Sequence, residues 1–273
     1  QLSIPSLYYE VSGILGLYAS GRLNGLIVDM GYSQTSIIPC VQGYCIDHAT
    51  KKLNNIGGKQ FDGYFNHLLR KSGITLHTNY QLDIVRDIKE TTCKCKSDNA
   101  YEKLQDDEEM NCEKYEMPDG TILQIGNARH RAPEVLFGPH LVGSQSKGIQ
   151  HEILDVINEC DLGLRKDLMS NITLIGGTSL LKGFGRRLVN ELVLSDYNRY
   201  NYQLLIAKES KDGLSITKDA SSKPVIGSKD TSTSTSMSQS LQLQKPQKIN
   251  KKTGVRIYAK PNRNYAAYLG GSI

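Results

Sequence analysis

Two glycine-containing motifs each follow a short apolar run, and both could contact a phosphate group. Gly25-Leu26-Ile27-Val28 leads into Asp29-x-Gly31, and Asn171-Ile172-Thr173-Leu174-Ile175 leads into Gly176-Gly177-Thr178. Glycines let a backbone approach phosphate or ribose closely and leave N–H groups exposed as anion donors. A carboxylate at the end of a strand can hold the water molecules around Mg2+. Each motif also occurs widely as an ordinary tight turn, so neither is specific by itself.

The sequence contains no complete motif for binding a metal ion directly and no cysteine pattern typical of a disulfide framework. His151-Glu152 begins like a zincin helix, but Asp155 stands where the second histidine would be needed. The six cysteines include no C-x-x-C pair and predict free thiols; they are Cys40, Cys45, Cys93, Cys95, Cys112 and Cys160.

Composition indicates a globular protein that works inside the cell. Of the 273 residues, 38% are hydrophobic and 22% are charged, which is ordinary for a soluble domain. The sequence has neither a run of about 18 apolar residues nor a basic-then-apolar leader, so we expect no membrane span and no signal peptide. The net charge of the whole chain is +5, and residues 208–252 by themselves also carry +5. The charges of the remaining residues therefore balance, and we expect no nucleic-acid-binding groove in the folded part.

Hydrophobic periodicity predicts strands that alternate with helices. The runs 25–31 and 36–39 flank a polar turn and predict a β-hairpin. A Pro-Asp-Gly turn between Tyr115 and Ile125 predicts two more short strands. The expected helices cover 60–71, 82–92, 149–160 and a stretch around 186–192. The last of these follows strand 171–175 and its glycine turn, an order suited to binding phosphate.

Residues 208–252 differ in composition from the rest of the chain. They are rich in Ser, Thr, Lys and Gln, contain no aromatic residue, and carry nine lysines against four acidic residues. Such a segment buries too little apolar surface to offset its ordering entropy, so we expect a disordered insertion. It is either a solvated loop without a role or a regulatory or partner-binding segment.

A series of motifs along nearly the whole chain, apart from that insertion, resembles actin in register. The matching motifs are Tyr18-Ala19-Ser20-Gly21-Arg22, Asp29-x-Gly31, Ile84-Val85-Arg86-Asp87-Ile88-Lys89-Glu90, Pro118-Asp119-Gly120, Ile125-Gly126-Asn127, Arg131-x-Pro133-Glu134-x-Leu136-Phe137, Arg165-Lys166-Asp167-Leu168, Gly176-Gly177-Thr178 and Gly270-Gly271-Ser272-Ile273. The chain is identified as a divergent member of the actin superfamily, with features similar to the nuclear actin-related proteins.

The resemblance implies the α/β ATPase fold that actin shares with heat-shock 70 chaperones and hexokinase-type sugar kinases, a ribonuclease H-like fold whose two lobes clasp Mg2+ and ATP. By this resemblance the chain begins after the family's first phosphate loop and stops before its last helices, so it supplies about one lobe. The implied parts are 1–57, the first part of the inner α/β subdomain; 58–144, a smaller helical subdomain; 145–207 with 253–273, the second part of the inner subdomain; and the insertion 208–252.

The resemblance also assigns roles to single residues. Asp29 corresponds to the carboxylate that holds Mg2+ through water, and Gly31 to part of the second phosphate hairpin. Lys89 and Glu90 resemble the pair that contacts adenine and ribose, although an exposed helical charge pair is the alternative. The remaining nucleotide contacts implied are Gly58 on the ribose side and the turn Gly176, Gly177 and Thr178 beneath the α-phosphate and adenosine.

Several positions depart from the family pattern. Ser12 stands where actin has the glutamine that positions the attacking water, and Tyr32 and Ser36 replace a carboxylate and a histidine of the phosphate hairpin. Phosphoryl transfer depends on positioning and electrostatics, so these losses predict much slower hydrolysis. Leu181 and Asn264, at an adenine-side tyrosine and a base-pocket lysine, indicate a looser nucleotide site.

The resemblance and its departures lead to one function and two alternatives. We expect an architectural actin-related protein that binds ATP and is at most a slow ATPase, working with protein subunits of a nuclear chromatin-remodelling or histone-acetyltransferase complex. The alternative is a filament-forming cytoskeletal ATPase whose partners are other actin-like protomers in the cytoplasm, which would require intact hydrolytic groups. A sugar or acetate kinase is the third possibility, but the motifs match actin and not those enzymes.

Overall fold

The computed structural model describes residues 9–76, 78–96, 112–195 and 254–272, all of which fall in one compact unit. The expected insertion 208–252 lies outside the described residues. The division of the rest into inner and smaller subdomains stays a prediction.

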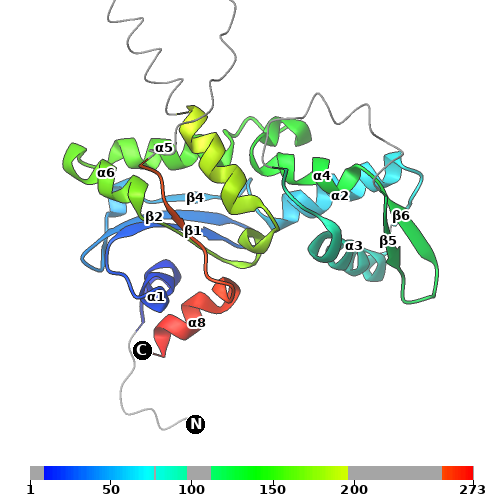
Figure 1. The fold of residues 1–273 in the computed structure, drawn as a ribbon, viewed down its shortest axis with the longest axis horizontal. Helices are drawn as coiled ribbons and strands as arrows, with labels where there is room; N and C mark the ends of the chain where they lie inside the picture. The colour runs from blue at the N-terminus through cyan, green and yellow to red at the C-terminus, as the bar shows by residue number, and fades with distance from the viewer. Residues whose placement is uncertain (1–8, 77, 97–111, 196–253, 273) are drawn as a thin grey trace, which may run out of the picture. The chain divides into compact units, whose positions relative to one another are not determined.

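The centre of the unit is a mixed sheet in the order β3-β2-β1-β7-β8, with β4 also paired to β2 (Figure 1). Its strands are β1 (Gly25–Met30), β2 (Thr35–Val41), β3 (Tyr44–Cys45), β4 (Lys51–Leu53), β7 (Ile172–Ile175) and β8 (Ile257–Tyr258). β1 and β2 are antiparallel, which confirms the predicted hairpin, while β7 runs parallel to both β1 and β8. The sheet therefore brings the ends of β1 and β7, and the motifs that follow them, to the same edge.

Both faces of β1 are buried, because alternate residues enter two different clusters. Leu26, Val28 and Met30 join the larger core, whereas Ile27 packs with Leu17 in the smaller one. On the smaller-cluster side lie α1 (Ser12–Ala19) and α8 (Ala266–Gly271), which pack side by side; on the other side lie α5 (Ile149–Glu159) and α6 (Leu162–Ser170) (Figure 1). A strand covered on both faces reads as a continuous apolar run, as Leu26-Ile27-Val28 does.

A second group of helices and a two-stranded sheet complete the described residues (Figure 1). α2 (Gly58–Lys71) and α3 (Asn79–Thr92) confirm two predicted helices, and Thr78 and Gln81 form a capping box that starts α3 three residues earlier than expected. β5 (Glu113–Glu116) and β6 (Ile122–Ile125) confirm the strands around the Pro-Asp-Gly turn. Short helical segments follow, namely α4 (Ala128–Arg131), η3 (Ala132–Leu136) and η4 (Pro139–Val142).

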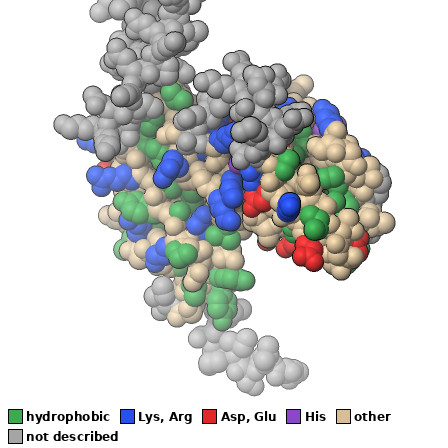
Figure 2. Space-filling view, turned by 45° about the vertical axis from the view of Figure 1, so that its right-hand side comes forward, with side chains coloured by type: hydrophobic (Ala, Val, Ile, Leu, Met, Phe, Trp, Pro, Cys, Tyr) green, Lys and Arg blue, Asp and Glu red, His purple; other side chains and the backbone are tan. Residues whose placement is uncertain are grey.

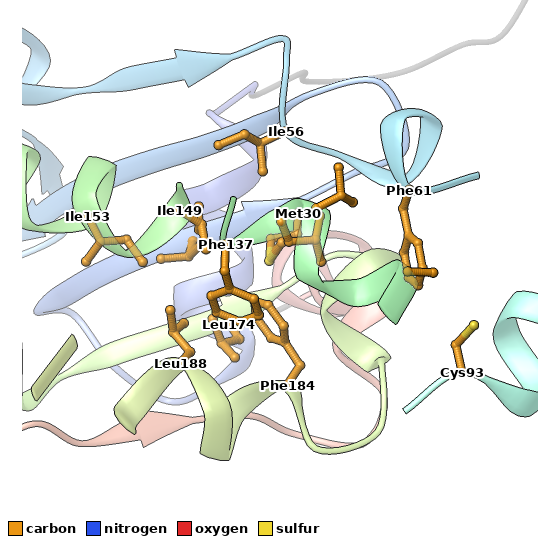
Figure 3. Packing of buried hydrophobic residues seen from close by; sticks show 14 of the residues in the cluster. Met30, Ile56, Phe61, Cys93, Phe137, Ile149, Ile153, Leu174, Phe184 and Leu188 are labelled. Atoms are coloured by element: carbon orange, nitrogen blue, oxygen red, sulfur yellow. The ribbon is translucent and has the colours of Figure 1, made fainter. Parts of the chain in front are cut away.

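The same larger core joins these helices to the sheet. Figure 3 shows Phe137 beside Phe184, with Leu174 and Leu188 close by, and the two phenyl rings lie 5.6 Å apart between centroids. Phe184 starts a helix over 184–195, two residues before the predicted start. The 3-10 turn η5 (Gly177–Leu180) separates this helix from β7, which agrees with the predicted order of strand, glycine turn and helix.

Two helices that pack on the sheet, α1 and α6, were not predicted, and for α1 the cause is its glycines. Gly13 and Gly16 lower helix propensity and interrupt the apolar pattern. A Cβ on either residue would lie 2.7 Å from the Cδ1 atom of Ile38 or Ile175, respectively. The glycines thus let the helix approach the sheet closely, a reason that only the tertiary structure reveals.

The surface of the unit is unevenly charged. On the face in Figure 2, Lys and Arg side chains gather near the middle of the view, and hydrophobic side chains lie around them. Within the described ranges, no helix has both the length and the apolar composition that a membrane span requires.

Candidate functional site

The ends of β1 and β7 bring the two glycine motifs into contact. Asp29 and Ile175 are partners in the parallel register, so Gly176 begins its turn beside the end of β1. Gly176 has φ of 86°, and a Cβ there would lie 2.4 Å from the Met30 carbonyl oxygen and 2.8 Å from Asp29 Oδ1. Only glycine fits this crossing without displacing the backbone.

The Gly31 carbonyl oxygen ties three predicted site segments together. It accepts a hydrogen bond from Thr178 Oγ1 at 2.8 Å and another from the Gly58 N–H at 3.2 Å. A Cβ on Gly58 would lie 3.1 Å from Thr178 Oγ1 and 3.0 Å from the Tyr32 ring. The phosphate hairpin, the start of α2 and the turn after β7 therefore meet at one point.

A pocket of about 540 Å3 opens next to this junction, and we call it the cleft pocket. That volume is within the range of small-molecule sites. Four of the predicted nucleotide contacts line it, namely Lys89, Glu90, Gly177 and Thr178. The divergent positions Tyr32, Leu181 and Asn264 also line it, with Phe61, Arg86 and Leu180. Asp29, Gly31, Gly58, Gly176 and Ser12 are not among its lining residues.

Lys89 and Glu90 lie in different environments, so they are not both part of an exposed charge pair, the alternative to nucleotide contact that the sequence left open. The Lys89 side chain is buried, and its Nζ lies 2.6 Å from Asp62 Oδ1 and 5.5 Å from the centre of the Phe61 ring. Glu90 is exposed at the pocket wall. Lys89 is therefore a buried lysine that is held by Asp62 at the pocket wall, not a solvated surface lysine.

Ser12 and Asp29 form a second part of the site, apart from the pocket lining. Ser12 lies at the start of α1, and its Oγ is 3.4 Å from Asp29 Oδ2. Burial raises the pKa of the Asp29 carboxyl, and the hydrogen bond from Ser12 opposes this rise. A nearby cation would stabilise the charged carboxylate, so the position suits a hydrated metal ion.

Sequence reasoning missed the position of Arg86 and Tyr32 together at the wall of the pocket. The Arg86 guanidinium lies 4.9 Å from the centre of the Tyr32 ring, and both residues line the cleft pocket. Tyr32 is thus part of the wall of the pocket, in addition to removing a carboxylate from the hairpin. The spacing of Arg86, Lys89 and Glu90 at i, i+3 and i+4 places them on one face of α3 and was a usable signal.

The described residues fit a nucleotide better than they fit a directly coordinated metal. The N–H groups of Gly177 and Thr178 have no hydrogen-bond acceptor among the described residues, and they lie at a pocket that also holds Lys89. Exposed backbone donors beside a lysine are suited to an anionic group. In the same part of the chain, no three His, Cys, Asp or Glu side chains are grouped to hold a metal ion. With the side chains that the structure describes, Asp29 would therefore hold Mg2+ through water or together with the nucleotide.

A mixed sheet whose parallel strands end in two glycine motifs beside a pocket defines the class of actin-type nucleotide-cleft folds. Residues 1–213 match the family model described as "Actin". An "Actin-like protein" of Neurospora crassa is 38% identical over 198 residues, which cover 70% of this chain and 51% of that protein. The chain belongs to the actin family, and it spans about half the length of this curated relative.

Replacing Gly176 tests whether the junction requires glycine. Gly176→Ala should lower the free energy of unfolding by about 1–3 kcal/mol from backbone strain alone, and by more because its Cβ would overlap the Met30 carbonyl. Urea unfolding followed by circular dichroism measures the change. The matched control is Gly163→Ala in α6, where an added Cβ meets nothing within 4 Å. Equal stability of the two variants would contradict the described geometry.

Proposed function

We propose that the chain forms part of a cleft that binds ATP with Mg2+, and that it serves as an architectural actin-related subunit with slow or no ATP hydrolysis. The observation that carries the proposal is the junction at Gly31, next to which Gly177 and Thr178, with free N–H groups, line the same pocket as Lys89. Backbone donors and an ammonium group already held in place by Asp62 need little reorganisation to bind a phosphate-bearing ligand.

Each proposed contact has a local reason. Gly177 and Thr178 offer backbone donors to the phosphate and adenosine side, and Gly176 gives the turn its shape. Lys89 supplies charge and the exposed Glu90 supplies an acceptor for ribose hydroxyls. The Gly31 and Gly58 backbones hold the walls together, and Asp29 would hold the water shell of Mg2+. When bound, Mg2+ supplies neutralisation of the phosphate charge.

Slow hydrolysis is supported by what surrounds Ser12. Its hydroxyl hydrogen-bonds to Asp29 at 3.4 Å and is too short to reach the place of a glutamine amide. Ser36 is buried and is the partner of Asp29 in the β1–β2 register, so it lies on the same face of the sheet as that carboxylate, with a hydroxyl in place of an imidazole. Tyr32 is engaged with Arg86. None of the three replaces the positioning group that hydrolysis requires.

The finer assignment concerns partners. We propose that the chain assembles with protein subunits of a nuclear chromatin-remodelling or histone-acetyltransferase complex, since its phosphate hairpin diverges as in nuclear actin-related proteins. A filament-forming cytoskeletal ATPase is the second candidate, favoured by family membership itself. The two differ in hydrolysis, because filament turnover requires it and an architectural subunit can use nucleotide as a stabilising ligand.

Titration calorimetry with Mg·ATP tests the binding site. Residues 1–273 by themselves should bind more weakly than low micromolar, because they span about half the length of the curated relative and the resemblance assigns half of the phosphate clamp to the other half. Lys89→Met should weaken binding by at least about tenfold, or about 1.4 kcal/mol. The control is Lys114→Met on β5, which is exposed and is not among the residues that line the cleft pocket. Equal affinity of the Lys89 and Lys114 variants would refute the assignment.

Single-turnover hydrolysis in the full-length protein tests the architectural reading. The unmodified protein should hydrolyse ATP far more slowly than a conventional actin when nucleotide is saturating. Ser12→Gln should raise the rate at least about tenfold, or roughly 1.4 kcal/mol of barrier, if water positioning is the main defect. A conventional rate in the unmodified protein would favour the filament-forming alternative, and no gain in the variant would assign the defect to Tyr32.

A further inference from the structure

A second cavity, of about 520 Å3, adjoins the cleft pocket at the end of the η5 turn. The two cavities share Leu180 and Leu181 in their walls. We call the second one the basic pocket, because Lys182, Arg186 and Arg263 line it with Cys95 and apolar or glycine residues of 180–185. No acidic side chain is among its lining residues. Apart from the shared residue Leu181, the nucleotide assignment uses no residue that lines this cavity.

The three cations of the basic pocket are not neutralised within the described part of the chain. Neither Lys182, Arg186 nor Arg263 has a carboxylate oxygen within ion-pair distance there. Arg263 donates to the carbonyl oxygens of Ser179 and Lys260 and to the Ser179 hydroxyl, which are all uncharged acceptors. Three like charges around one cavity repel one another, so an anion that enters it is stabilised by all three.

The neighbouring residue Arg187 shows that this arrangement is not a general property of the segment. Its guanidinium is buried and forms ion pairs with Glu134 and Glu191, each at 2.8 Å. Burial raises the pKa of the Glu134 carboxyl, which Arg187 counteracts. Adjacent arginines thus have opposite environments: Arg187 is neutralised inside the core, and Arg186 is left at the cavity.

Backbone geometry adds donors to the same cavity. Gly183, with φ of 83°, passes so close to the Cys95 carbonyl oxygen that a Cβ would lie 2.5 Å from it. The helix over 184–195 starts immediately afterwards. The N–H groups of Gly185 and Arg186 have no acceptor among the described residues. Such donors reinforce the attraction that the three side chains exert on an anion.

We propose that the basic pocket binds a small ligand that carries two or more phosphate groups. Three uncompensated cations exceed what one singly charged anion needs, and a volume of about 520 Å3 accommodates a polyphosphorylated ring. Arg and Lys are the side chains that bind phosphate oxygens, with Arg able to contact two at once. The ligand is either a soluble polyphosphate or a phosphorylated lipid headgroup, which share this chemistry.

Calorimetric titration of the whole chain with inositol hexakisphosphate at physiological salt tests the proposal. We expect micromolar affinity that falls at least tenfold in the double variant Lys182→Gln/Arg186→Gln. The control Lys114→Gln/Lys166→Gln removes the same charge from exposed positions outside the pocket and should change affinity less than twofold. Similar losses in the two double variants would overturn the proposal, because binding would then follow net charge alone.

Two further arms distinguish the ligand source and the site. If a lipid headgroup is the ligand, the chain should sediment with vesicles of 5% phosphatidylinositol 4,5-bisphosphate in phosphatidylcholine. The Lys182→Gln/Arg186→Gln double variant should abolish this sedimentation. Binding of inositol hexakisphosphate without sedimentation on vesicles assigns a free polyphosphate as the ligand. If Mg·ATP displaces inositol hexakisphosphate and Lys89→Met weakens the binding of inositol hexakisphosphate, the ligand occupies the cleft pocket and the proposal is overturned. Equal competition by a polyglutamate peptide would show a surface for acidic proteins instead.

Discussion

The hydrogen bond from Thr178 Oγ1 to the Gly31 carbonyl oxygen is the contact on which the site depends. It joins residues that are 147 positions apart, and it does so at the edge where β1 and β7 both end. The same carbonyl also accepts the Gly58 N–H, so the phosphate hairpin, the first turn of α2 and the turn after β7 cannot move independently. A ligand held by two of these segments is therefore presented to the third.

Parallel pairing of β1 with β7 makes that contact possible, and burial on both faces makes the pairing stable. α1 and α8 cover one side of the sheet, and α5 and α6 cover the other (Figure 1). The Phe137–Phe184 pair continues the core toward α2 and the 3-10 turns (Figure 3). Since the same core continues from the sheet to the base of α2, the position of Gly58 relative to Gly31 is set by packing as well as by its hydrogen bond.

Much of the fold could be predicted from local patterns, because periodicity reports burial directly. The short apolar runs of β1 and β2 and the helical spacing in α2, α3 and α5 predicted those elements, and the actin fold followed from motifs in series. The helix α1 was missed because Gly13 and Gly16 look unfavourable until the proximity of the sheet is known. The pairing of Tyr32 with Arg86 and of Lys89 with Asp62 could not be predicted, since each joins segments distant in the sequence.

Amide hydrogen exchange of the chain with and without saturating Mg·ATP tests most directly whether the β1 and β7 ends form a nucleotide site. The free N–H groups of Gly177 and Thr178 should exchange more slowly when nucleotide is bound, as should amides of 86–90 on α3, while the β5–β6 hairpin and α6 should be unchanged. Unaltered exchange at 176–178 under conditions where ATP is bound, or protection confined to the α1 and α8 side of the sheet, would contradict the account.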